Sequence, residues 1–102
     1  MIKFMDNIHK TALIGTGYWG SIIANTLIKI TKKKIIVYDK LKENSSLLKQ
    51  KFNNRILVAK SYNEIFKNQK IENIILATHP SVNYNLGKKT LLLKKNLFVE
   101  KP

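Results

Sequence analysis

The sequence contains no cysteine, only two prolines and no purely apolar run longer than four residues. Without cysteine, a disulfide framework and a thiolate metal site are both excluded. The apolar runs of four residues, among them Ile35–Tyr38 and Ile74–Ala77, are far shorter than the roughly 20 residues that cross a bilayer. The segment Met1–Asp6 lacks the apolar stretch and the small-residue cleavage site of a secretory signal. We therefore predict a soluble, cytoplasmic protein with no metal site and no membrane partner.

Arginine is nearly absent, since Arg55 is the only one among 19 basic residues, which stand against 6 acidic residues. A formal net charge of +13 on 102 residues would ordinarily suggest a nucleic acid or an anionic membrane as partner. However, proteins that recognise bases and phosphates favour the planar guanidinium fork, which lysine lacks. The lysines are spread along the chain among many Ile and Asn residues, which share A/T-rich codons with lysine. We interpret the excess as base-composition bias on a solvated surface, with a nucleic-acid-binding domain as a remote alternative.

Short β-branched runs alternate along the chain with stretches of helical spacing, over a length that suits one modest domain. Strands are predicted at Ile8–Ile14, Lys34–Tyr38, Ile56–Val58, Asn73–Ala77 and Leu97–Val99. Helices are predicted at Ile22–Thr31, Leu41–Phe52, Ser61–Asn68 and Ser81–Lys94. This alternation is typical of a parallel sheet with crossover helices on both faces. The predicted fold is therefore α/β, a doubly wound sheet of about five parallel strands.

Local signals refine the helix ends and the connections between elements. Ser61 and Glu64 match a capping box, in which each side chain accepts a hydrogen bond from the backbone N–H of the other residue. Ser81 is predicted to cap the helix after the fourth strand. The lysine clusters at 32–34 and 94–95 fall in helix-to-strand connections, where we expect solvated charge. 

A glycine-rich loop joins the first predicted strand to the first predicted helix. Gly15, Gly17 and Gly20 form a G-x-G-x-x-G pattern and are three of the chain's four glycines. In the dinucleotide-binding fingerprint the first glycine permits a tight turn, the second lets the backbone approach a pyrophosphate, and the third lets the helix pack against the strand. The helix N-terminus offers free N–H groups to the phosphates. Any strand-to-helix turn can use glycine, so the pattern alone is a weak signal of dinucleotide binding. The fourth glycine of the chain, Gly87, is predicted to be a close-packing position on its helix.

An acidic residue, Asp39, ends the second predicted strand 19 residues beyond Gly20. This spacing is close to that of the carboxylate that binds the adenosine ribose in dinucleotide-binding folds. The alternative interpretation is a turn residue or an N-cap. A carboxylate here would repel a 2′-phosphate, so NAD is favoured over NADP. Lys40 would partly offset that repulsion, which leaves NADP as the less favoured cofactor.

Polar residues follow the fourth and fifth predicted strands. The segment Thr78-His79-Pro80 follows the fourth strand, and Glu100-Lys101-Pro102 follows the fifth. In a doubly wound sheet the carboxyl ends of the strands form the ligand-binding edge, so both segments are placed near the nicotinamide half of a dinucleotide. Taken alone, His79 is more typical of a capping or solvated histidine, and Lys101 of a surface lysine.

Together, these segments closely resemble the Gfo/Idh/MocA oxidoreductase family along the whole chain. The resemblance rests on the glycine loop 15–20, the segment 77–81, the helix 83–89 and the motif Val99-Glu100-Lys101-Pro102. Members of that family have an A-T-P-type segment after the fourth strand and an E-K-P signature after the fifth. The pair Tyr18-Trp19 resembles the glycine loop of family members that act on nucleotide-linked sugars. One departure is Asn83, where many relatives carry histidine, and we expect this to alter helix packing rather than abolish cofactor binding.

The resemblance implies a role for each matching position. The implied cofactor-binding residues are Gly15, Thr16, Gly17, Tyr18, Trp19 and Gly20 in the loop, Asp39 at the adenosine ribose, Thr78, His79 and Pro80 beside the cofactor, and Glu100 near the nicotinamide ribose. Lys101 would contact the cofactor as well and would be the active-site lysine, next to the hydroxyl or carbonyl that loses or gains the hydride. Beside a cationic nicotinamide ring its pKa can be lowered, so that it exchanges a proton with the substrate.

The leading hypothesis is therefore that residues 1–102 are the NAD-binding part of an oxidoreductase acting on a sugar, nucleotide-sugar or polyol. A further C-terminal domain would supply the substrate pocket and the interface of a homo-oligomer, and turnover by this part alone is not expected. The alternative is a non-catalytic NAD-binding or sensing module of the same fold.

Overall fold

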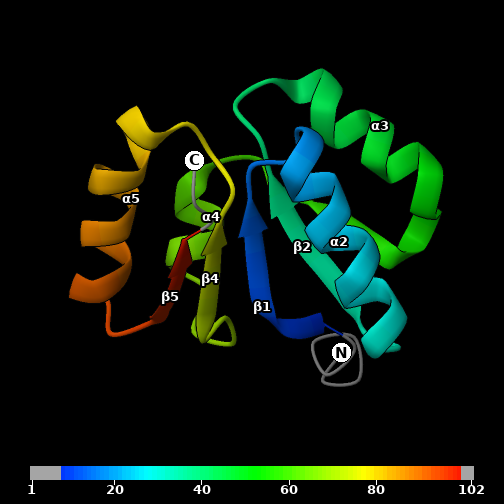
Figure 1. Ribbon diagram of the computed structural model, residues 1–102. Helices are drawn as coiled ribbons and strands as arrows, with labels where there is room; N and C mark the ends of the chain where they lie inside the picture. Colours follow the sequence, from blue (N-terminus) through cyan, green and yellow to red (C-terminus); the bar gives the residue numbers. More distant parts are fainter. Residues whose placement is uncertain (1–7, 100–102) are drawn as a thin grey trace.

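The computed structural model describes residues 8–99, which form one parallel sheet flanked by helices (Figure 1). The strands are β1 (Ile8–Ile14), β2 (Lys34–Tyr38), β3 (Ile56–Val58), β4 (Asn73–Leu76) and β5 (Asn96–Val99). The helices are α2 (Tyr18–Ile30), α3 (Lys42–Phe52), α4 (Tyr62–Phe66) and α5 (Pro80–Leu92), with a short 3-10 turn η1 (Asn53–Arg55) after α3. All four strand pairs are parallel. The predicted doubly wound α/β fold is confirmed.

The strand order β3-β2-β1-β4-β5 places β1 at the centre of the sheet. From β1 the chain runs outward to β2 and β3, and it then returns to the other side of β1 to form β4 and β5. The order therefore reverses between β1 and β4, where Ile14 is aligned with Leu76. Ligands of open α/β sheets bind beyond the carboxyl ends of the strands at such a reversal.

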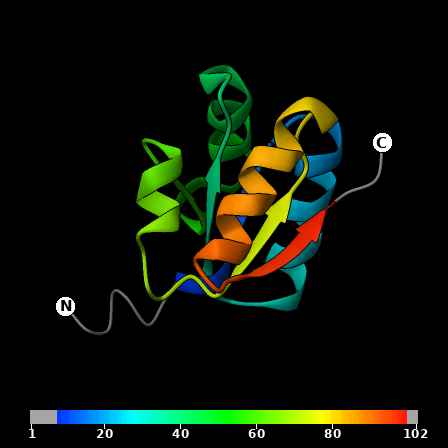
Figure 2. The same ribbon diagram turned by 90° about the vertical axis from the view of Figure 1, so that its left-hand side faces the viewer.

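Helices cover both faces of the sheet, because side chains alternate across each strand. Leu13 and Val37 belong to one apolar cluster, in which Ala24 of α2 and Leu48 of α3 are buried against them. Ile14 belongs to the opposite cluster, in which Ile65 and Phe66 of α4 and Leu86 of α5 are buried against the sheet. Figure 2 views the molecule from the side of α4 and α5, with α2 behind the sheet. Within residues 8–99, no helix is both long and apolar enough to cross a membrane.

Two predicted capping arrangements differ in the structure. The N-cap of α5 is His79 rather than Ser81, and its Nδ1 accepts the backbone N–H of Ser81 at 3.1 Å. The helix begins earlier than predicted because Pro80 occupies its first turn, where a missing N–H costs nothing. At α4, Ser61 Oγ accepts the N–H of Glu64 at 3.3 Å, as the capping box predicts. The prediction of the reciprocal hydrogen bond is wrong, since Glu64 Oε1 accepts the backbone N–H of Lys60 at 3.0 Å instead of that of Ser61.

The predicted solvation of the second lysine cluster is wrong at Lys95. This side chain is 9% exposed, and its Nζ donates to the carbonyl oxygen of Asn68 at 2.9 Å and to that of Ile71. Burial lowers the pKa of Lys95. The ammonium thereby holds the connection between α4 and β4, a tertiary role that a local cluster of lysines does not reveal. Lys94 and the pair Lys32–Lys33 are exposed as expected.

Candidate functional site

The turn after β1 needs glycine at its first position. Gly15 has φ +100°, a left-handed conformation that side chains rarely adopt, and its N–H donates to Tyr38 O at 2.8 Å. A Cβ added there would lie 2.4 Å from the carbonyl oxygen of Ala77, which follows β4. Gly15 therefore allows three parts of the chain, after β1, β2 and β4, to meet at one point.

The other two loop glycines face different surroundings. A Cβ at Gly20 would lie 1.8 Å from the carbonyl oxygen of Gly15, so the close approach of α2 to the turn requires its absence. Around Gly17 a Cβ would meet nothing within 4 Å. The backbone at Gly17 therefore borders open space, which a ligand can enter. Gly87 packs closely as predicted, because its Cβ would lie 3.2 Å from a side-chain carbon of Leu97.

The N-terminus of α2 is suited to an anion. Its N-cap is Gly17, which has no side chain to accept the first helical N–H groups, and no acidic residue lies in its first turn. The first N–H groups of a helix have no partner within the helix. Together with the positive end of the helix dipole, they provide donors for a phosphate or pyrophosphate.

The carboxylate of Asp39 has bonding partners on both of its oxygens. Oδ1 accepts the backbone N–H of Leu41 at 2.8 Å, the pattern of an aspartate that starts a turn. Oδ2 accepts the N–H of Thr16 at 2.7 Å, the Thr16 hydroxyl at 3.2 Å and Asn44 Nδ2 at 3.2 Å. Asp39 therefore links the end of β2 to the glycine loop, in addition to forming the local turn.

A cavity of about 300 Å³ lies at the carboxyl edge of the sheet. It is lined by Gly15, Gly17, Asp39, Lys40, Leu41, Asn44, Tyr62, Ala77, Thr78, His79 and Val82. Five of these, Gly15, Gly17, Asp39, Thr78 and His79, are residues for which the sequence predicts cofactor binding. Gly15 and His79, which are far apart in the sequence, thus meet at the reversal of strand order.

Asn44 and Tyr62 are lining residues that the sequence analysis missed. Each lies at the start of a helix that follows a strand, so both are carried to the carboxyl edge. The ring of Tyr62 contacts that of Tyr38 edge-to-face, with 4.7 Å between centroids. The pKa of Tyr62 is raised, first by burial and then by Tyr38 and Asp39. Their place directly after predicted strands two and three was the signal that could have identified them.

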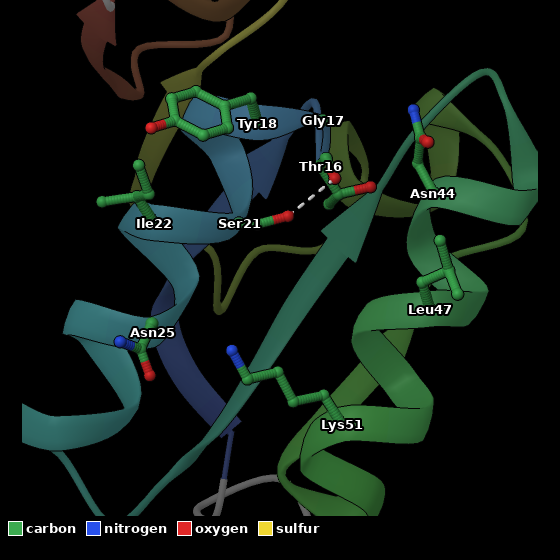
Figure 3. A pocket seen from close by; sticks show the side chains of 9 residues that line it. All are labelled: Thr16, Gly17, Tyr18, Ser21, Ile22, Asn25, Asn44, Leu47 and Lys51. Carbon is green, nitrogen blue, oxygen red and sulfur yellow. Dashed lines mark hydrogen bonds between the residues drawn. The ribbon is translucent and has the colours of Figure 1, made fainter.

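A second cavity, of about 400 Å³, lies between α2 and α3 on the other side of the loop (Figure 3). It is lined by Thr16, Gly17, Tyr18, Ser21, Ile22, Asn25, Asn44, Leu47 and Lys51. Thr16 and Tyr18, for which cofactor contact is predicted, face this cavity rather than the first. Ser21 Oγ donates to Thr16 O at 3.0 Å, and Gly17 and Asn44 line both cavities.

The remaining predicted residues lie elsewhere. Trp19 is 55% exposed and stacks edge-to-face on Tyr18 with 5.1 Å between centroids. Gly20 is buried against Gly15, and Pro80 starts α5. Glu100 and Lys101 lie outside the described residues. Among residues 8–99, no three His, Cys, Asp or Glu side chains are grouped so as to hold a metal ion.

Two side chains of the segment after β4 are held by α5. The Thr78 hydroxyl donates to Asn83 Oδ1, and His79 caps the helix through Nδ1. Asn83, the departure from the family pattern, thus holds a residue of the first cavity. His79 is used as a cap, one of the roles that its position alone suggested.

The comparisons with known proteins agree with this geometry. Residues 9–102 match the family model GFO_IDH_MocA, described as the oxidoreductase family with an NAD-binding Rossmann fold. No curated protein matches the chain. 

Solved structures show the same fold at low sequence identity. GenD2 from gentamicin A biosynthesis, in complex with NAD, is 20% identical with a TM-score of 0.78, over 90% of this chain and 26% of that one. Biliverdin reductase from Synechocystis, in complex with biliverdin and NADP+, is 16% identical with a TM-score of 0.78, over 90% and 29%. UDP-N-acetylglucosamine 3-dehydrogenase from Acidithiobacillus ferrooxidans is 18% identical with a TM-score of 0.76, over 90% and 29%.

The chain thus spans less than a third of the length of these structures. At such identities they show the fold alone, whereas the family model covers nearly the whole chain. The chain belongs to the Gfo/Idh/MocA oxidoreductase family, of which it carries the NAD(P)-binding Rossmann domain.

Proposed function

We propose that this chain binds NAD along the carboxyl edge of its sheet, as the cofactor domain of a sugar or polyol oxidoreductase. The observation that carries the proposal is the cavity that joins Gly15, Gly17, Asp39, Thr78 and His79. Its chemistry fits the cofactor, since uncapped N–H groups of α2 suit the pyrophosphate and the Asp39 carboxylate suits ribose hydroxyls. Open space at Gly17 leaves room for close approach of the phosphates.

The preference for NAD over NADP is supported by Asp39, whose carboxylate lines the cavity and would repel a 2′-phosphate. Lys40 lines the same cavity and provides a positive charge beside it. The related structures hold NAD in one case and NADP+ in another, so this preference comes from the residues of this chain. We expect tighter binding of NAD+ than of NADP+ in a direct titration.

A bulky side chain at Gly17 tests cofactor binding. Because a Cβ at this position meets nothing within 4 Å, Gly17→Leu should fold normally and yet occupy the space in front of the α2 N-terminus. We expect at least a tenfold loss of NAD(H) affinity by fluorescence titration, with an unchanged thermal unfolding curve. Unchanged affinity in a folded variant would refute the assignment of this site.

The bound nicotinamide would accept or donate a hydride, which is the chemistry that the cofactor supplies. We propose Lys101 as the residue that holds the proton exchanged with the substrate hydroxyl or carbonyl, as the family motif implies. Lys101→Met should abolish hydride transfer to sugars or polyols while leaving NAD affinity within about twofold. If the unaltered full-length protein binds NAD and transfers no hydride with any such substrate, the sensing module becomes the better description.

The related structures include a UDP-N-acetylglucosamine 3-dehydrogenase and a myo-inositol 2-dehydrogenase, which supports a hydroxylated ring as the substrate class. We propose that a further domain of the full-length protein supplies the pocket for this substrate. We also propose that the full-length protein forms a homo-oligomer. A screen of sugars, nucleotide-sugars and polyols for NAD reduction tests the substrate class, and size-exclusion chromatography with light scattering tests the assembly.

A further inference from the structure

Asn44 lies in the first turn of α3, five positions beyond Asp39, and the glycine-loop fingerprint does not include it. Its Nδ2 donates a 3.2 Å hydrogen bond to Asp39 Oδ2. It also lines the cavity at the carboxyl edge together with Asp39. The side chain thus stands beside the carboxylate for which ribose binding is proposed.

The hydrogen bonds of Asp39 show how much of its acceptor capacity is left. Oδ2 receives three donors, two from Thr16 and one from Asn44, whereas Oδ1 receives only the N–H of Leu41. Each carboxylate oxygen offers about two lone-pair sites. Oδ2 is therefore fully used, and Oδ1 retains about one site.

An adenosine ribose presents two neighbouring hydroxyl groups, at the 2′ and 3′ positions. One hydroxyl can donate to Asp39 Oδ1, which leaves the second without an acceptor on this carboxylate. A buried hydroxyl without a partner weakens binding, so the site needs a second polar group near Asp39.

Asn44 has the required capacity. A side-chain amide offers two N–H donors and one carbonyl acceptor. Within residues 8–99, its only side-chain hydrogen bond is the one to Asp39, so one N–H and the carbonyl remain for a ligand. The amide is half-buried and is held at one end by that bond.

We propose that Asn44 is a second ribose-recognition residue. Its amide hydrogen-bonds the hydroxyl that Asp39 cannot serve, while its bond to Oδ2 keeps the carboxylate in position. This assignment rests on the proposed function, because it concerns the adenosine half of the same cofactor.

The test compares two nucleotides that differ only in the hydroxyls concerned. In the full-length protein, binding of ADP and of 2′,3′-dideoxy-ADP is measured by calorimetry for the wild type and for Asn44→Ala. We expect Asn44→Ala to weaken ADP binding about 3- to 10-fold, the effect of one hydrogen bond, and to change dideoxy-ADP binding less than about twofold. The matched control, Gln50→Ala, removes an exposed amide from the same helix and should change neither.

An equal loss for both nucleotides, or no loss for ADP, would overturn the role of Asn44 and leave the cofactor site standing. If the wild-type protein binds neither ADP nor NAD, the proposed function itself fails. The proposal that Asn44 also positions the Asp39 carboxylate is tested by the NMR resonance of the Thr16 backbone amide, because this N–H donates to the same oxygen of Asp39. The resonance should shift in nucleotide-free Asn44→Ala and stay in place in Gln50→Ala, and an unshifted resonance in Asn44→Ala would contradict the positioning.

Discussion

The Asp39 carboxylate accepts the backbone N–H of Thr16 in a 2.7 Å hydrogen bond that joins residues 23 positions apart. Thr16 is only 2% exposed, so water cannot readily replace the carboxylate as acceptor. We expect Asp39→Ala to lower the free energy of unfolding by about 1–3 kcal/mol, because a buried N–H is left without a partner. Urea unfolding without nucleotide measures this loss separately from any effect on binding.

Thr16→Val is the matched variant for that experiment. It keeps the backbone N–H and removes only the 3.2 Å bond from the hydroxyl to Asp39. The loss should be smaller, about 0.5–1.5 kcal/mol. Equal losses in the two variants would mean that the backbone bond does not contribute as inferred.

An added methyl group should destabilise the protein strongly at Gly20 and hardly at all at Gly17. Gly20→Ala places a Cβ 1.8 Å from the carbonyl oxygen of Gly15, so α2 must move away from the turn. We expect a loss of about 3 kcal/mol or a failure to fold. Gly17→Ala meets nothing within 4 Å and should stay within about 1 kcal/mol of the wild type. Thermal unfolding of both variants decides this, and similar stabilities would contradict the packing inferred at Gly20.

Arg55 holds the C-terminal end of α2 in place. Its Nη2 donates to the carbonyl oxygens of Thr31, of Lys33 at 3.1 Å and of Ile28 at 3.3 Å. Arg55→Lys keeps the charge, but its Nζ is one bond closer to the backbone than Nη2 and cannot take the same position among these carbonyl oxygens, so we expect a loss of about 1–3 kcal/mol in the free energy of unfolding. Lys32→Ala, on the exposed connection after α2, is the control and should change it by less than about 0.5 kcal/mol. An unchanged free energy of unfolding in Arg55→Lys would show that these hydrogen bonds contribute little to stability.

His9 should make stability fall on mild acidification. Burial lowers the pKa of His9, with smaller contributions from Lys33 and Lys10, and its Nδ1 accepts the N–H of Thr11 at 3.0 Å. Because the folded state binds this proton less readily than the unfolded chain, protonation favours unfolding as pH falls through the ordinary histidine value of about 6.5. The free energy of unfolding should therefore decrease from about pH 7 to about pH 5.5.

The measurement is the urea midpoint across that range, compared with His9→Gln. The variant lacks the titrating ring, so its stability should depend less on pH over the same interval. An identical pH dependence in the two proteins would assign the effect to other groups.

The sequence alone was sufficient for the α/β class, because period-2 and period-3.6 patterns alternate and depend only on local geometry. It also predicted a tight turn at Gly15 and close packing at Gly20 and Gly87, and the structure bears out all three. The predictions of individual capping hydrogen bonds failed where a residue one or two positions away could form the bond equally well. His79 displaced Ser81 as the cap of α5, and Glu64 bonded Lys60 rather than Ser61.

What only the tertiary structure decided are the contacts between distant segments. Lys95 is a buried tie to the carbonyl oxygens of Asn68 and Ile71, although its sequence surroundings are those of a solvated lysine. Asp39 serves both as a turn residue and as the acceptor for Thr16, a combination that spacing cannot predict. Periodicity and turn chemistry are properties of neighbouring residues, so the sequence determined the fold class and predicted which segments reach the carboxyl edge of the sheet. Hydrogen-bond partners across the sheet depend on which chain ends the strand order brings together, and only the folded chain establishes that.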